Sequence, residues 1–227
     1  MSSSSKDSEN EMINPDEQES EKSKDDKLID QLIILYYKQT LIYWDSTVQS
    51  TIETWISKNN HNLAHIINLL EQRKETSIEC ACLLGFFYHY GIGFNSKNYD
   101  EAFQLYQYAA DKDDSFANIQ IGELYQIIKK DDARAKEAYK RAALLGHPQG
   151  AYKYAYFLCR KEKIYWIRKS AEKGFEAAQQ DMASHCHYGY GVLKDVHCAL
   201  SWLLKYSKSN SQARIGYLKL AWKFNIL

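Results

Sequence analysis

The feature that most constrains this chain is a repeat in which small residues return at regular distances. Five segments carry a small residue directly after an aliphatic or aromatic one, and each of the first four is followed by a pair of small residues or a looser equivalent. The distance from a pair to the next small residue is 13 in three successive cases (109 to 122, 142 to 155 and 170 to 183). The single small residues are Gly85, Gly122, Ala155, Ala183 and Gly216, and the pairs are Ala109–Ala110, Ala142–Ala143, Ser170–Ala171 and the looser Tyr206–Ser207.

This spacing is typical of stacked helical hairpins. Each hairpin buries one face on the next, so the connection between hairpins has a constant length, while the loop inside a hairpin points to solvent and can vary. Only two prolines and ten glycines occur in 227 residues, which suits long helices. The sequence therefore predicts an all-α fold, an α-solenoid of helix-turn-helix repeats with a helical cap at its N-terminal side.

Two of the small residues are glycines inside predicted helices. A glycine in a helix costs about 1 kcal/mol relative to alanine, and this cost is tolerable where another backbone must come close. We expect Gly85 and Gly122 to face the alanine pair of the second helix in their own repeats.

Gly-x-Gly occurs twice, at Gly91 and again at Gly189. A loop that binds phosphate places its glycines before a helix, usually after a strand, and carries a third glycine. Both motifs instead follow a predicted helix, where a left-handed glycine closes the last turn. We therefore predict that they form turns.

The repeat motifs themselves are specific. "CACLLGFFYHYGIGF" with "AFQLYQYAADKD" matches the pattern A-x-x-x-L-G-x-x-Y-x-x-G-x-G-V followed by A-x-x-W-Y-x-x-A-A-x-x-G, and "AQQDMASHCHYGYGV" matches it in part. On these residues the chain resembles the Sel-one-like repeat (SLR) family, a relative of the tetratricopeptide class, over about Glu79 to Asn210. It is also similar to fungal arrays that often accompany kinase-like domains. The resemblance implies binding to a protein or peptide, including a separate kinase-like signalling protein, since this chain has no kinase motif.

Composition divides the chain into a tail, a cap and an array. Residues 1–26 hold nine acidic and three basic residues and almost nothing apolar, so we expect disorder there; whether its serines are phosphorylated stays open. The predicted divisions are a disordered acidic tail over 1–26, the helical cap over 27–76 and the array over 77–227, with repeats at about 79–115, 116–147, 148–176 and 177–210 and a degenerate C-terminal helix over 211–227.

Charge and hydropathy limit the classes of partner that the chain can bind. With 29 basic and 29 acidic residues, the chain lacks the excess charge on which nucleic-acid binding depends, and no apolar run reaches the roughly 18 residues of a membrane span. The acidic first residues do not resemble a signal peptide. These features predict a cytoplasmic or nuclear protein that is not secreted, without nucleic acid, membrane or cofactor, and leave the oligomeric state open.

Cysteine and histidine offer one alternative function. His187, His197 and Cys198 fall within a short span and could form a thiol- or zinc-dependent enzyme site. Five cysteines at irregular spacing favour reduced thiols over a disulfide framework. Some secreted members of the family that the chain resembles carry disulfides between paired repeat cysteines, but we do not recognise that spacing here.

The leading hypothesis is a non-enzymatic adaptor or scaffold in signalling or complex assembly. The first helix of each repeat should line the inner face of a curved array. Counted from the position of the first alanine in the pattern, which Cys80, Ala117, Gly150 and Ala178 occupy, the residues three and six places on share one face. They predict a groove of mixed charge with two exposed aromatic rings, suited to a peptide. A purely structural or degenerate array is the third alternative. The groove candidates are Leu83, Phe86, Gln120, Glu123, Lys153, Tyr156, Asp181 and Ser184.

Overall fold

The computed structural model describes residues 23–41, 45–206, 215–216 and 219, and every regular element in this part of the chain is helical. The predicted all-α class is thereby confirmed. The predicted C-terminal helix over 211–227 falls almost entirely outside the described residues. The elements are α1 (Lys24–Thr40), α2 (Asp45–Lys58), α3 (Leu63–Arg73), α4 (Ile78–Tyr90), α5 (Tyr99–Ala110), α6 (Ser115–Glu123), the π-helical turn η2 (Leu124–Ile128), α7 (Asp132–Leu144), α8 (Pro148–Ala155), α9 (Arg160–Glu172), α10 (Glu176–Tyr188) and α11 (Val196–Tyr206).

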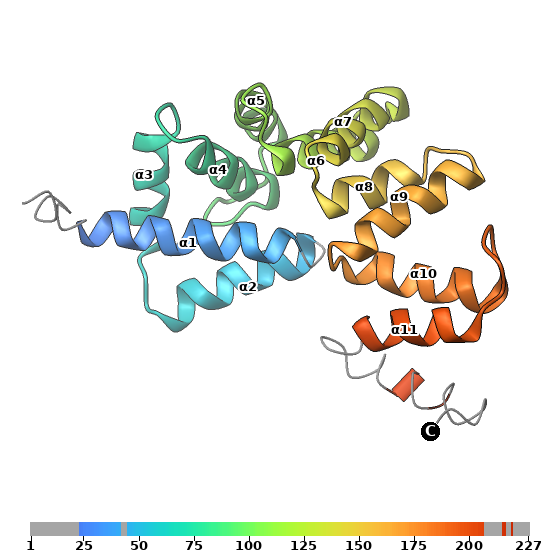
Figure 1. Cartoon of the computed structure of the whole chain (residues 1–227). Helices are drawn as coiled ribbons and strands as arrows, with labels where there is room; N and C mark the ends of the chain where they lie inside the picture. The colour runs from blue at the N-terminus through green and yellow to red at the C-terminus, as the bar shows by residue number, and fades with distance from the viewer. Residues whose placement is uncertain (1–22, 42–44, 207–214, 217–218, 220–227) are drawn as a thin grey trace, which may run out of the picture.

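The helices form a curved array. From α3 onward each helix packs against the next along the chain, and Figure 1 shows that they follow an arc. The even-numbered helices α4, α6, α8 and α10 are the first helices of four hairpins, and α5, α7, α9 and α11 are the second. Helix α1 crosses the hollow side of the arc and contacts α2, α3 and α4 (Figure 1). The predicted solenoid is confirmed, and α1 lies inside its curve.

Two clusters of buried apolar side chains hold the array together. The first extends from α1 to α7 and includes three of the largest buried side chains, Tyr36, Tyr106 and Tyr139. The second joins α8, α9, α10 and α11. A helical-repeat fold has no single centre, and each hairpin instead shares its core with its neighbours.

One main-chain hydrogen bond closes three of the four hairpins, although their loops differ in length. The residue before the second helix donates its N–H to a carbonyl near the end of the first helix, at 2.9 Å in each case. In these hairpins the donor also caps the second helix, because its side chain accepts from a backbone N–H near the start of that helix. The pairs are Asn98 with Tyr88, Asp131 with Tyr125 and Asp195 with Cys186.

Both Gly-x-Gly motifs form turns, as predicted. Gly91 and Gly189 end their helices in the left-handed conformation, with φ of 75° and 77°. The second glycine of the first motif has another role, because a Cβ on Gly93 would lie 2.6 Å from Cδ1 of Ile67 in α3. The loop thus packs closely on α3.

The helical glycines approach a different group from the one expected. A Cβ on Gly85 would lie 3.0 Å from Cε1 of Tyr106, and one on Gly122 would lie 2.5 Å from Cε1 of Tyr139. Each tyrosine lies about one turn before the alanine pair, and its ring covers the space that we assigned to the alanine methyl groups. It is Gly150, at the start of the third hairpin, that packs directly on an alanine pair.

The boundary between the acidic tail and the cap is earlier than expected. Helix α1 begins at Lys24, inside the predicted tail over 1–26, and residues 1–22 lie outside the described part. Ser23 and Asp26 form a capping box in which each side chain accepts from the other residue's backbone N–H. Acidic residues stabilise the first turn of a helix through its dipole, so the charge that suggested disorder here favours a helix start.

Two of the five cysteines contradict the expectation of reduced thiols. Cys186 in α10 and Cys198 in α11 form a disulfide, whereas Cys80, Cys82 and Cys159 are free. The two bonded residues are 12 apart in sequence, but the hairpin brings their Cα atoms to 5.8 Å, within the range that a disulfide bridges. Whether two cysteines can pair depends on their distance in space across the hairpin, and the loop length sets that distance.

We expect this disulfide to stabilise the fourth hairpin. Replacing Cys186 and Cys198 together by alanine should lower the free energy of unfolding by about 2–3 kcal/mol, because the crosslink closes a short loop in the unfolded chain. Urea unfolding of the oxidised protein, followed by circular dichroism, measures the difference. The wild-type protein in excess reductant should approach the double variant, and Cys159→Ala, at an exposed free thiol, should change stability little. Equal stability of the oxidised protein and the double variant would contradict the prediction.

Candidate functional site

The predicted groove residues lie in two different environments. Leu83 and Phe86 of α4 and Gln120 of α6 are fully buried. The expectation that Phe86 is an exposed aromatic is therefore wrong. The reason is α1, since the ring of Tyr36 lies 5.1 Å from that of Phe86, centroid to centroid, and covers it.

Glu123 and Lys153 connect two neighbouring hairpins. The Lys153 ammonium of α8 lies 2.5 Å from a carboxylate oxygen of Glu123 at the end of α6, and the two side chains are 18% and 9% exposed. Their opposite charges attract each other more strongly here than they would in open water. These two candidates face one another across the joint between repeats, as residues on a common inner face should.

Tyr156 and Asp181 form the next contact along the same face. Oδ2 of Asp181 in α10 accepts hydrogen bonds of 2.9 Å from the hydroxyl groups of both Tyr156 and Tyr152. Burial raises the pKa of both tyrosines above the usual value, so both hydroxyls remain donors at neutral pH. Although its hydroxyl is fixed in this way, Tyr156 is 52% exposed.

We call Lys153, Tyr156, Asp181 and Ser184 the α8–α10 surface. Ser184 is exposed one turn after Asp181 on α10. The Lys163 ammonium of α9 lies 4.1 Å from the centre of the Tyr156 ring, a cation–π contact that fixes the ring further. This surface carries both charges and an exposed ring, which is the character that the sequence predicted for the whole groove.

A pocket adjoins this surface that the sequence did not indicate. Its volume is about 400 Å³, and aromatic rings form much of its wall. Only two of its six residues, Lys153 and Tyr156, are among the groove positions counted along the first helices. A second pocket of about 340 Å³ lies between α8 and α9 but shares no residue with the α8–α10 surface. The residues that line the first pocket are Gln126, Tyr139, Tyr152, Lys153, Tyr156 and Phe157.

The alternative enzyme site around His187, His197 and Cys198 is not supported. Cys198 is bonded to Cys186, so its sulfur offers no thiolate as nucleophile or metal ligand. Within residues 23–41 and 45–206, the structure brings together no group of three or more histidine, cysteine, aspartate or glutamate side chains that could hold a metal ion. In the same part of the chain, no helix combines the length and apolar character that a membrane span requires.

The stacked hairpins and their curved inner face define a helical-repeat protein of the α-solenoid class. Within that class the chain belongs to the Sel1 repeat family, whose model matches residues 78–114, 115–147, 164–175 and 176–211. Sel1 repeats generally serve as non-enzymatic scaffolds for protein–protein interaction. No curated protein matches the chain significantly.

Solved structures show the same fold. A Sel1 repeat protein from Oxalobacter formigenes superposes with a TM-score of 0.63 at 19% identity, over 82% of this chain and 86% of that one. The protein c5321, a protective antigen of uropathogenic Escherichia coli strains with an SLR fold, superposes with a TM-score of 0.60 at 26% identity. That match covers 67% of this chain, which spans only 36% of c5321.

Proposed function

We propose that this protein is a non-enzymatic adaptor that holds a segment of another protein on its α8–α10 surface. The observation that carries the proposal is the state of Tyr156, whose ring is half exposed while Asp181 and Lys163 hold it in place. An aromatic ring that is fixed before binding loses little conformational entropy on contact, and such residues are common binding hot spots.

The adjoining pocket supports the same proposal. Its volume of about 400 Å³ suits a large apolar side chain of the partner, while Lys153 in its wall and Asp181, bonded to Tyr152 and Tyr156 of the wall, offer polar contacts. Function would then consist of positioning, in which the array raises the effective concentration of one bound protein near another. A separate kinase-like signalling protein is the partner that the resemblance to fungal arrays favours.

Tyr156→Ala tests the proposal. Partners recovered with the tagged protein from its native cells and measured by quantitative mass spectrometry should fall about tenfold, because loss of one hot-spot ring costs more than 1 kcal/mol of binding free energy. Tyr165→Ala is the matched control, since Tyr165 on α9 is 58% exposed but lies outside the α8–α10 surface. Equal loss with both variants, or no loss with Tyr156→Ala, would contradict the proposal.

A further inference from the structure

Helix α1 carries the residue pattern of a helix bound in a groove. Its four buried residues are Ile29, Leu32, Tyr36 and Thr40, and at most 1% of each is exposed. They follow one another at i, i+3, i+7 and i+11, so they form a single stripe along the helix. Amphipathic helices of binding partners dock into apolar grooves through such a stripe.

Helix α1 packs on α2, α3 and α4, and at Tyr36 its stripe covers the first two hairpins. The Tyr36 ring lies between those of Phe86 in α4 and Phe116 in α6, 5.1 Å from each. Its hydroxyl lies 3.6 Å from the buried Sγ of Cys82, one turn before Phe86. Thus α1 covers Phe86 on the first hairpin, the groove position that corresponds to the exposed Tyr156 on the third.

The residue after Tyr36 adds a polar contact. The Tyr37 hydroxyl donates a 2.6 Å hydrogen bond to Oδ2 of Asp114, the residue that caps α6. Burial raises the pKa of Tyr37, so it remains a donor. The groove therefore accepts an aromatic ring followed directly by a hydrogen-bond donor.

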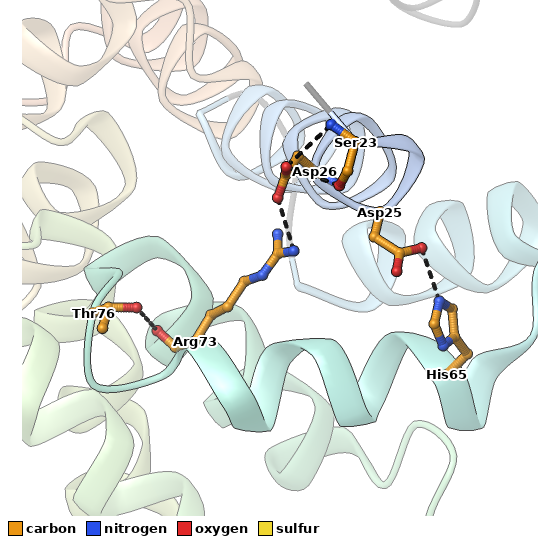
Figure 2. A network of polar contacts seen from close by, with 6 residues as sticks. All are labelled: Ser23, Asp25, Asp26, His65, Arg73 and Thr76. Atoms are coloured by element: carbon orange, nitrogen blue, oxygen red, sulfur yellow. Dashed lines mark hydrogen bonds and ion pairs between the residues drawn. The ribbon is translucent and has the colours of Figure 1, made fainter. Parts of the chain in front are cut away.

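The beginning of α1 is attached differently, as Figure 2 shows. Asp25 contacts His65 at 3.0 Å and Asp26 contacts Arg73 at 2.8 Å, both on α3. The side chains in these two polar contacts are between 28% and 46% exposed. Polar contacts that reach into water contribute little to stability, so these contacts hold the first turn of α1 only weakly.

We propose that the inner face of α4 and α6 is a docking site for an amphipathic helix of a partner protein, and that α1 occupies this site as a built-in competitor. The partner helix would resemble α1 in chemistry, with an aromatic residue at the place of Tyr36 and apolar residues four and seven places before it. This inference rests on the proposed function only in taking the partner to be a protein, and it concerns a different surface.

The test changes the occupant and leaves the groove intact. Asp25→Asn, Asp26→Asn and Tyr37→Phe, combined in the full chain, remove the polar contacts of α1 with α3 and α6 but keep its four buried residues. The probe is a fluorescent synthetic peptide with the sequence of residues 23–41, titrated by anisotropy. It should bind the triple variant at least tenfold more tightly than the wild-type protein, because apparent affinity rises with the fraction of protein in which α1 has left the groove.

Matched controls isolate the groove. Tyr108→Phe removes a tyrosine hydrogen bond on α5, to the Glu75 carbonyl, and should bind the peptide as the wild type does. A peptide with Leu32→Ala and Tyr36→Ala should not bind the triple variant. The single variant Asp25→Asn changes one exposed group and should shift affinity about twofold in the same direction, which decides the question if the triple variant fails to fold.

Equal peptide affinity for the wild type, Asp25→Asn and the triple variant, or no binding to any of them, would overturn the inference and make α1 a permanent part of the core. Adding Tyr156→Ala to the triple variant should leave peptide binding unchanged. The experiments therefore test binding at the α8–α10 surface and docking in the groove under α1 independently of each other.

Discussion

Replacing Phe86 by alanine should lower the free energy of unfolding by about 3–5 kcal/mol, the usual cost of removing a large buried aromatic side chain. Phe86 is fully buried, and its ring packs against those of Tyr36 and Tyr90 at centroid distances of 5.1 and 4.5 Å. Removal of the ring leaves a cavity between α1 and α4 that rigid helices cannot close. Urea unfolding followed by circular dichroism measures the loss.

The comparison that matters is with Tyr156, the other aromatic residue of the predicted groove. Because Tyr156 is half exposed, its change to alanine should cost about 1 kcal/mol or less. Losses of similar size in the two variants would show that Phe86 is not a core residue. If the difference is as large as expected, weaker binding by a Phe86→Ala protein reports unfolding, and only Tyr156→Ala informs on the binding surface.

Gly150→Val should have the second-largest effect, a loss of about 3 kcal/mol or more. A Cβ at this position would lie 2.5 Å from Cβ of Ala142 and 3.1 Å from main-chain atoms of Ala142 and Ala143. Main chain in the last turn of α7 cannot move aside as a side chain does, so α7 and α8 must separate. Thermal or urea unfolding reveals the change.

Gly85→Ala is the graded control. Its added methyl group would meet the ring of Tyr106 at 3.0 Å, and the better helix propensity of alanine offsets part of the strain. We expect a loss of about 1 kcal/mol. If Gly150→Val were as stable as Gly85→Ala, the close approach of α7 and α8 would not be a constraint on the array.

The repeat architecture could be predicted because its determinants are local. The constant spacing of small residues fixes the joint between hairpins, and Gly91 and Gly189 mark helix ends through a conformation that other residues rarely adopt. Glu123 contacts Lys153 and Tyr156 contacts Asp181, so these candidates on neighbouring first helices lie within reach of one another. Each of these features depends on residues near one another in sequence or on the regular repeat.

The features that could not be predicted depend on contacts between distant segments. The pattern around Tyr36 indicates a helix with one apolar face, but it does not say which surface that face covers. The burial of Phe86 depends on the position of α1, whose Tyr36 ring packs against it. Likewise, the disulfide between Cys186 and Cys198 depends on how the fourth loop returns the chain, which the spacing in sequence does not determine.

The hydrogen bond that closes the hairpins has a consequence for how such a chain can change. It joins residues that are 10, 6 and 9 positions apart in the first, second and fourth hairpins, with the same length of 2.9 Å. Insertions or deletions in the hairpin loops therefore need not shift the helices relative to one another, and exposed loop tips tolerate such changes best. The hairpin loops can acquire new sequence while the curvature of the helical array is preserved.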